Sequence, residues 1–190
     1  MKEIIAGVDE VGRGSLVGPV FAAAVIIEKK IDKKKLKDSK KLSKKNREIL
    51  NLYIKKNCIW AIGSASINEI EKYNILNASL LAMKRAIIKL KKKPQLVLID
   101  GNKLPEIDNY NLKNIIKGDE KIPEISAASI IAKVSRDRLV SKMAKNFKKY
   151  LWHKNSGYGT KGHIQAIKKF GITKHHRKTF RPVHNILSLR

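Results

Sequence analysis

Short apolar runs bounded by charged residues, glycine or proline recur along the chain, and this pattern is typical of strands. The first run covers residues 4–8 and the second covers 21–27, and we expect the two to pair as a hairpin. A third run, at 59–66, alternates loosely, whereas 96–99 is apolar throughout. Residues 112–117 are predicted to form a short edge strand.

Apolar residues spaced three and four apart predict helices between these strands. Ser43 suits the N-cap of a helix over residues 44–55. Asn68 is expected to cap a short helical turn, and Asn74 or Asn77 to cap a longer helix that ends near residue 91. The buried stripe of that longer helix is expected to contain Leu76, Leu80, Met83, Ile87 and Leu90.

The later part of the chain predicts two more helices. Pro123 suits the first turn of a helix that runs from about residue 125 to about residue 149. Thr160 is expected to cap a helix that ends near residue 170. The chain has 190 residues and shows no internal repeat or low-complexity linker, so we expect one domain over residues 1–190.

Acidic residues follow two of the apolar runs directly. Asp9 and Glu10 come at the end of the first run, and Asp100 ends the run at 96–99. Adjacent side chains on a strand point to opposite faces, so the pair sets one carboxylate against the core, which is costly unless a cation neutralises it. A divalent metal ion is the simplest such cation, because hard ions prefer carboxylate oxygens. The alternative for either motif alone is a solvated turn or an Asx-turn.

Three glycines, Gly12, Gly14 and Gly18, follow the acid pair, with Arg13 between the first two. They let the backbone turn and let a ligand approach closely. Their spacing also suggests the phosphate loop of a dinucleotide-binding fold. Acids directly before the loop would repel a pyrophosphate, however, and residues 21–27 resemble a strand more than the helix that such a fold requires.

Lysine and arginine number 42 against 16 acids, which gives a formal net charge of +26. This excess favours a polyanionic partner, with nucleic acid first and an anionic membrane surface second, although many lysines are expected to be simply solvated. The single cysteine, Cys58, excludes an intrachain disulfide and a cysteine-rich zinc site. We find no signal-peptide pattern and no membrane-length apolar run, so we expect a cytoplasmic protein without membrane contact.

Polar residues on the helix predicted from residue 125 form a candidate phosphate site. Ser126, Ser129 and Lys133, with Arg136 or Asp137, share one stripe at three- and four-residue spacing. Hydroxyls near a helix N-terminus with a lysine one turn on suit a phosphate. The alternative is a tight contact between helix and sheet that uses the small residues of the same segment.

Other segments offer further contacts with nucleic acid. Ser39 and Lys40 lie in a lysine-rich loop that is either solvated or in contact with phosphates. Tyr158 stands between glycines, where it either stacks on a sugar or base or fills a gap against the core. For the adjacent His175 and His176, phosphate contact or a helix-end position is favoured over metal binding, because no cysteine or spaced acid accompanies them.

Five blocks of sequence, in order, resemble the type 2 ribonuclease H family, known in bacteria as ribonuclease HII. They are GVDEVGRG with GPV at 7–20, DSKKL at 38–42, LIDGN at 98–102, ISAASIIAKVSRD at 125–137, and GYGT with a following histidine at 157–163. The resemblance implies an α/β ribonuclease H-like fold, in which helices flank a mixed five-stranded sheet and the C-terminal portion is helical. A monomer is expected.

The resemblance also implies an activity, which is hydrolysis of the RNA strand of RNA–DNA hybrids and incision at ribonucleotides embedded in duplex DNA. It implies that two Mn²⁺ or Mg²⁺ ions, about 4 Å apart, serve the reaction. It assigns the catalytic and metal-binding roles to Asp9, Glu10, Asp100 and Asp119. It assigns recognition of the ribose 2′-hydroxyl to Gly12, Arg13 and Gly14 together with Tyr158, and it adds weight to Ser39 and Lys40.

One position departs from the family pattern. Ser15 stands where the family usually has proline, and we expect it to loosen the glycine loop slightly, since proline would fix φ. A second function class, a non-catalytic nucleic-acid-binding module, fits the net charge equally well. The four acids do not fit it, because they oppose phosphate binding unless metal ions sit among them.

Overall fold

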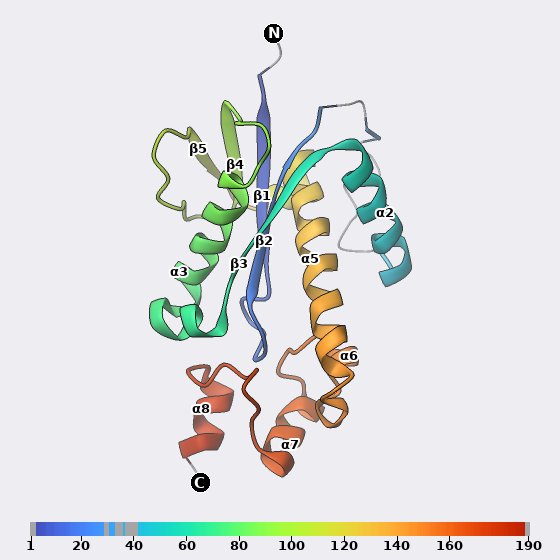
Figure 1. Ribbon diagram of the computed structural model, residues 1–190, viewed down its shortest axis with the longest axis vertical. Helices are drawn as coiled ribbons and strands as arrows, with labels where there is room; N and C mark the ends of the chain where they lie inside the picture. The colour runs from blue at the N-terminus through green and yellow to red at the C-terminus, as the bar shows by residue number, and fades with distance from the viewer. Residues whose placement is uncertain (1–2, 29–30, 33–35, 37–41, 189–190) are drawn as a thin grey trace.

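The computed structural model describes residues 3–28, 31–32, 36 and 42–188, and a five-stranded mixed sheet forms its centre in the order β3-β2-β1-β4-β5 (Figure 1). The β1–β2 and β2–β3 pairs are antiparallel, so the predicted hairpin is confirmed, whereas β4 and β5 run parallel to β1. β5 is an edge strand, as expected. The strands are β1 Ile5–Val11, β2 Val20–Ile26, β3 Ile59–Ala65, β4 Leu96–Asp100 and β5 Leu112–Ile115.

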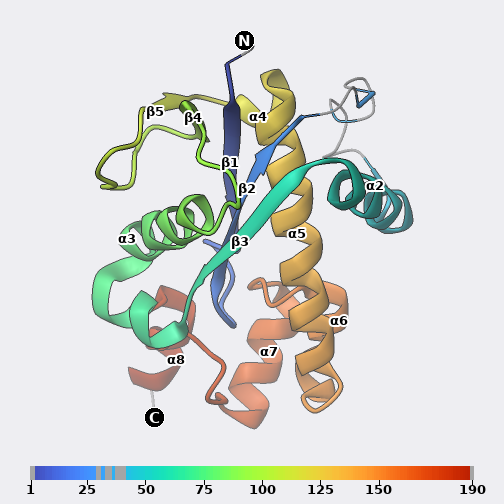
Figure 2. The same ribbon diagram turned by 45° about the horizontal axis from the view of Figure 1, so that its top comes forward.

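Helices cover both faces of this sheet, with α3 on one side and α2 and α5 on the other (Figure 2). Alternate residues of β2 show the division, because Ala22 and Ala24 belong to the core beneath α3, and Ala23 and Val25 belong to the core beneath α5. The helices are α2 Lys44–Asn57, α3 Ile67–Ile88, α4 Gly118–Lys121, α5 Pro123–Ala144, α6 Trp152–Asn155, α7 Lys161–Phe170 and α8 Arg181–Ser188.

Local capping explains where the longer helices begin. Ser43 accepts a hydrogen bond from the Asn46 backbone N–H at 3.2 Å, and Thr160 caps α7 in the same way, so both predicted caps are confirmed. The prediction that Asn68 caps a short helical turn was wrong, because Ser66, two residues earlier, is the N-cap of α3 and forms a reciprocal capping box with Glu69.

Two further helix features can be compared with the sequence pattern. α3 bends at Asn74 (φ 65°), whose side chain accepts from the Asn77 N–H at 3.1 Å, so Asn74 does cap the second half of α3. α5 stops at Ala144 rather than near residue 149, because the chain turns there to bury Tyr150 and Trp152. Burial of those aromatic rings outweighs the helical pattern of residues 145–149.

The C-terminal segment packs at one end of the sheet, where α6, α7 and α8 lie together in both views (Figures 1 and 2). Its separate core includes Leu16 and Val17 of the glycine loop, Val140 of α5 and Trp152 of α6. This contact joins the glycine loop to the C-terminal helices. No helix within the described ranges combines the length and the apolar character needed to cross a membrane.

Candidate active site

The register of two parallel strands brings the strand-end acids together. Val8 of β1 pairs with Ile99 of β4, so Asp9 and Asp100 are the next residues on neighbouring strands. Asp9 lies opposite Ala23 of β2, on the face covered by α5, and Ser129 of α5 donates a hydrogen bond to its carboxylate. The predicted convergence of two strand ends therefore occurs in the fold.

The electrostatics of this acid cluster, which we define as Asp9, Glu10 and Asp100, are unfavourable in the protein alone. Burial raises the pKa of Asp9 well above its usual value, and the charges of Glu10 and Asp100 raise it further. The Ser129 hydroxyl and the Glu10 backbone N–H, 2.7 Å from Asp9 Oδ1, act in the opposite direction. Burial also raises the pKa of Glu10, although the Arg13 guanidinium 3.3 Å away lowers it.

The fourth predicted acid is held next to Asp100 by backbone hydrogen bonds. Asp100 Oδ1 accepts from the Gly118 N–H at 2.7 Å, and Gly118 begins the short helix α4 that carries Asp119. Asp119 is only 5% exposed, and the Ser126 hydroxyl of α5 donates to its backbone carbonyl. Asp119 therefore follows directly after a residue that contacts Asp100.

A divalent ion fits this donor set chemically. The side chains offer carboxylate oxygens, which Mg²⁺ and Mn²⁺ prefer, and the raised pKa values of Asp9 and Glu10 reflect a lack of positive charge that a cation would supply. Among the described residues, no three acidic, histidine or cysteine side chains are already arranged tightly enough to hold a metal ion. The structure thus brings acidic side chains together and leaves their negative charge without enough compensating positive charge.

The glycine loop and Tyr158 also meet. Ser15 forms an isolated β-bridge with Tyr158, and the Leu16 N–H donates to the Gly157 carbonyl at 2.9 Å. A side chain at Gly14 would lie 3.9 Å from the Tyr158 ring. The ring itself is half-buried, with Lys133 Nζ 5.9 Å from its centroid. Segments about 140 residues apart in the chain therefore form one surface.

Two buried arginines bind the backbone of this surface from the interior of the protein. Arg136 donates to the carbonyls of Val17 at 2.9 Å, Ser156 at 3.1 Å and Pro19 at 3.3 Å. Arg177 donates to the carbonyls of Gly18 at 2.8 Å and Arg13 at 3.0 Å. Gly12 has φ +94°, and a Cβ there would lie 2.1 Å from Arg136 Nε, so only glycine fits.

The placement of Arg136 corrects the predicted phosphate stripe. Arg136 is fully buried and binds backbone carbonyls, so it cannot face a phosphate. Burial lowers its pKa, and the pKa of Arg177 falls to about 9 through burial and the nearby charge of Arg136. Sequence reasoning missed Arg177 altogether, since it lies in a run of basic residues that reads as solvated.

The other predicted substrate-binding residues differ in their exposure and in their contacts. Ser126 is 1% exposed and its hydroxyl is occupied by the Asp119 carbonyl, so it supports α4 instead of reaching the surface. Ser129 contacts Asp9, and Lys133 forms a 3.0 Å ion pair with Asp137. Ser39 and Lys40 lie outside the described residues. Arg13 and Gly14 are exposed.

The histidine prediction was wrong for His176. Its side chain is 1% exposed and its ring packs against Trp152, Tyr150 and His163, so it does not contact phosphate. The spacing of single aromatic residues along the chain gave no signal that these rings meet, because they come from the 3-10 turn Lys148–Tyr150, from α6, from α7 and from the loop before α8.

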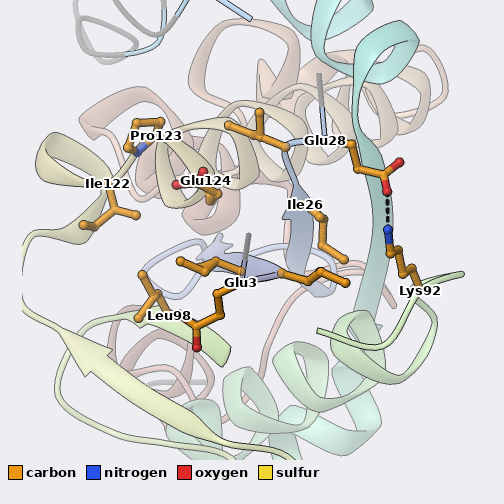
Figure 3. Close-up of a pocket in the computed structure, with 11 residues that line it drawn as sticks. Glu3, Ile26, Glu28, Lys92, Leu98, Ile122, Pro123 and Glu124 are labelled. Carbon is orange, nitrogen blue, oxygen red and sulfur yellow. Dashed lines mark hydrogen bonds and ion pairs between the residues drawn. The ribbon is translucent and has the colours of Figure 1, made fainter. Parts of the chain in front are cut away.

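A separate pocket lies near the start of β1, with a volume of about 370 Å³ (Figure 3). The end of β2 and the start of α5 complete its lining, and a 2.6 Å ion pair between Glu28 and Lys92 lies at its side. None of the four predicted catalytic acids lines this pocket. It is therefore distinct from the acid cluster.

A known family and known structures match nearly the whole chain. The model of the family Ribonuclease HII matches residues 6–184. The chain is 70% identical over 185 residues to a ribonuclease HII of Pelagibacter ubique, covering 97% of this chain and all of that protein. Ribonuclease H2 from Pyrococcus horikoshii has a TM-score of 0.83 at 25% identity, with 98% of both chains covered.

A more distant structure shares the fold alone. Bst-RNase HIII, solved in complex with Mn²⁺, superposes with a TM-score of 0.74 at 16% identity, covering 98% of this chain and 70% of that one. The predicted α/β architecture with a mixed five-stranded sheet and flanking helices is thus confirmed by both the strand order and the structural neighbours.

Proposed function

The chain belongs to the ribonuclease HII family and is a ribonuclease H, a metal-dependent endoribonuclease; we propose that Asp9, Glu10, Asp100 and Asp119 form its metal-binding catalytic centre. We propose further that two Mn²⁺ or Mg²⁺ ions serve it, and that it incises at single ribonucleotides in duplex DNA as well as in RNA–DNA hybrids. The single observation that carries the site is the register that sets Asp9 beside Asp100.

Metal chemistry explains why several acids serve a polyanionic substrate. When bound, divalent ions supply a reactive water, neutralise the phosphate and stabilise the leaving oxygen. The Mn²⁺ in the complex of Bst-RNase HIII, a protein of the same fold, supports this choice of ion. The burial and mutual repulsion of Asp9 and Glu10 support it independently.

The chain's own residues orient these carboxylates. The Ser129 hydroxyl and the Glu10 N–H hold Asp9, and the Gly118 N–H holds Asp100. Each donor belongs to an element of the fold and fixes the resting position of its carboxylate. Because no three acid side chains of the described residues are yet arranged to hold an ion, the carboxylates would move closer together on metal binding. Arg13 pairs with Glu10 at the exposed edge of the acid cluster, where a substrate phosphate would arrive.

Selection of RNA requires recognition of the 2′-hydroxyl. We assign this recognition to the backbone of Gly12, Arg13 and Gly14 with the Tyr158 ring, because the Ser15–Tyr158 bridge places them side by side. Lys133, Ser129 and the loop residues Ser39 and Lys40 remain predicted contacts with phosphates. The net charge of +26 would steer the nucleic acid towards the protein.

Cleavage mapping tests the proposal. An RNA–DNA hybrid and a duplex with one embedded ribonucleotide would be incubated with Mg²⁺, Mn²⁺ or EDTA. We expect incision of both substrates with either ion and none with EDTA. Asp100→Asn should abolish it, and the exposed loop variant Asp108→Asn is the matched control.

Two outcomes would contradict this assignment in different ways. Full Mn²⁺-dependent cleavage by Asp100→Asn would remove that residue from the centre. Tight, salt-sensitive binding of both duplexes with no cleavage in any metal would instead indicate a nucleic-acid-binding module.

A further inference from the structure

A chain of buried hydrogen bonds ends at the backbone of Tyr158. Trp152 Nε1 donates to His163 Nε2 at 2.9 Å, and the Nε2 atoms of His163 and His176 are 3.3 Å apart. The other nitrogen of His163, Nδ1, lies 2.9 Å from the Tyr158 carbonyl. The three side chains, at most 1% exposed, form what we call the histidine cluster: Trp152, His163 and His176.

The donors in this cluster determine the tautomer of each ring. The Thr173 backbone N–H donates to His176 Nδ1 at 2.9 Å, so the His176 proton is on Nε2 and points to His163. The indole N–H of Trp152 can only donate, so His163 Nε2 must accept. The proton of neutral His163 is therefore on Nδ1 and is donated to the Tyr158 carbonyl.

The same cluster is joined to the glycine loop. His176 forms an isolated β-bridge with Val17, in which the Gly18 N–H donates to the His175 carbonyl and the Arg177 N–H to the Leu16 carbonyl, both at 2.9 Å. His163 thus lies between Tyr158 on one side and, through His176, the backbone of residues 16–18 on the other. Hydrogen bonds through the two histidines thus connect Tyr158 to the glycine loop, which are the two parts of the predicted ribose-binding surface.

We propose that His163 is a positioning residue, whose Nδ1–H holds the Tyr158 backbone so that its ring meets the ribose against the glycine loop. The inference rests on the proposed function, since it concerns how that site selects a ribonucleotide. Trp152 and His176 contribute by keeping the His163 proton on Nδ1. Loss of this donor leaves the Tyr158 carbonyl with the Thr160 N–H as its remaining donor, at 2.9 Å, so the Tyr158 backbone stays attached but its orientation is held less tightly.

Two amide variants separate the two nitrogens of His163. In His163→Asn the side-chain N–H₂ lies near the former Nδ1 and can still donate to the Tyr158 carbonyl. In His163→Gln the amide lies near the former Nε2, so it can accept from Trp152 but no longer reaches that carbonyl. The pair have similar polarity, and circular dichroism melting would establish that both are folded.

We expect kcat on the single-ribonucleotide duplex to fall about tenfold in His163→Gln and less than about threefold in His163→Asn. KM should stay within about twofold of the parent, because phosphate contacts dominate affinity and are untouched. Tyr158→Phe, which keeps the backbone bond, serves as the reference for the lost hydroxyl. Equal kcat in His163→Gln and the parent, or equal loss in both amide variants, would overturn the inference.

A spectroscopic measurement tests the same bond without activity. Two-dimensional ¹⁵N–¹H spectra of the parent should show His163 protonated on Nδ1 and His176 protonated on Nε2. The opposite tautomer of His163 would overturn the inference even if the variants were slow. A parent that cleaves neither substrate with either ion would overturn the proposed function and this role with it, whereas an active parent with an unaffected His163→Gln overturns this role alone.

Discussion

The acid cluster and the histidine cluster are both groups of buried titratable side chains, yet their surroundings are opposite. Asp9, Glu10 and Asp100 lie close enough for their like charges to interact, so burial and this repulsion raise the pKa values of Asp9 and Glu10. His163 and His176 are surrounded by N–H donors and apolar rings, and burial lowers both of their pKa values, that of His176 to about 4. Added positive charge would stabilise the acid cluster, whereas the ring nitrogens of the histidine cluster already have hydrogen-bond partners.

The two clusters consequently respond to protons in opposite directions. In the metal-free protein the folded acids bind protons more readily than the unfolded ones, so the stability they contribute is lost as pH rises through their raised pKa values. The folded histidines bind protons less readily than unfolded ones. The contribution of His176 is lost as pH falls from about 6.5 towards its folded value near 4, and that of His163 is lost in the same direction. This contrast distinguishes the acid cluster, which is suited to binding cations, from the histidine cluster, which has a structural role.

The largest expected effect is on catalysis, in Asp9→Asn. We expect cleavage to fall at least about a thousandfold, because the variant removes a charged metal ligand from the centre. The metal-free variant should nevertheless melt at a higher temperature than the parent at neutral pH, since it removes a buried charge beside Glu10 and Asp100.

Initial rates and thermal melting in EDTA measure the two effects of this change. Asp108→Asn, an exposed carboxylate in the β4–β5 loop, should alter neither. A lower melting temperature for Asp9→Asn without metal would contradict the view that the acid cluster is repulsive.

Next in size is the loss of stability in Arg136→Met, which tests the support behind the glycine loop. The substitution removes the Arg136 donor from the part-buried carbonyls of Pro19 and Ser156, and it leaves the buried Val17 carbonyl with the Ser15 hydroxyl alone. We expect unfolding free energy to fall by about 3 kcal/mol, measured by urea denaturation at neutral pH.

The matched control is Arg138→Met, two residues along the same helix. Arg138 is half exposed and pairs with Glu48, so its loss should cost less than about 1 kcal/mol. Similar losses in the two variants would show that burial of Arg136 adds no stability beyond that of a surface ion pair.

A smaller effect, visible only with pH, is expected in His176→Asn. Asparagine can still accept from the Thr173 N–H but does not titrate. The parent should therefore lose about 2 kcal/mol more than the variant between about pH 7 and about pH 5, from the fall of the His176 pKa to about 4. Urea denaturation at both pH values measures the difference.

His163 remains in that variant, so its own lowered pKa should leave a smaller dependence of the unfolding free energy on pH. An unchanged slope would mean that His176 does not resist protonation in the folded protein. The acid cluster is unaltered in both proteins, so its opposite contribution cancels in the comparison.

The acid cluster was predictable from sequence because its signal is local. Each acid directly follows an apolar run, and parallel neighbours in a sheet place their carboxyl ends together, so Asp9 and Asp100 needed no knowledge of distant contacts. Asp119 carried no such signal, since it lies on a four-residue helix, and only the family resemblance singled it out.

The histidine cluster had no comparable signal. Trp152, His163 and His176 come from separate segments, and their hydrogen bonds exist only once the C-terminal helices have packed on the glycine loop. The same long-range packing explains why α5 ends at Ala144 and why Arg136 turned inward although its spacing matched a polar stripe. The caps Ser43 and Thr160, by contrast, depend on neighbours in sequence and were predicted correctly.

Ser15 lies in the glycine loop, two residues before Val17, which forms a bridge with His176 of the histidine cluster. The hydrogen bonds of Ser15 argue against the expected loosening of this loop. Its hydroxyl donates to the Val17 carbonyl at 3.1 Å and accepts from the Val17 N–H at 3.3 Å. Its own N–H donates to the Gly12 carbonyl at 3.3 Å, a bond that proline could not make. The hydrogen bonds of serine thus replace the stiffness expected of proline at this position.

The smallest expected effect is therefore in Ser15→Ala, with a loss of about 1 kcal/mol of unfolding free energy. Ser188→Ala is the matched control, because that hydroxyl also donates to a backbone carbonyl, His184, but in an exposed helix, and its loss should cost less than about 0.5 kcal/mol. Urea denaturation compares them. If Ser15→Ala were as stable as the parent, the loop would owe its order to the Ser15–Tyr158 bridge and to the two buried arginines, with no contribution from the serine hydroxyl.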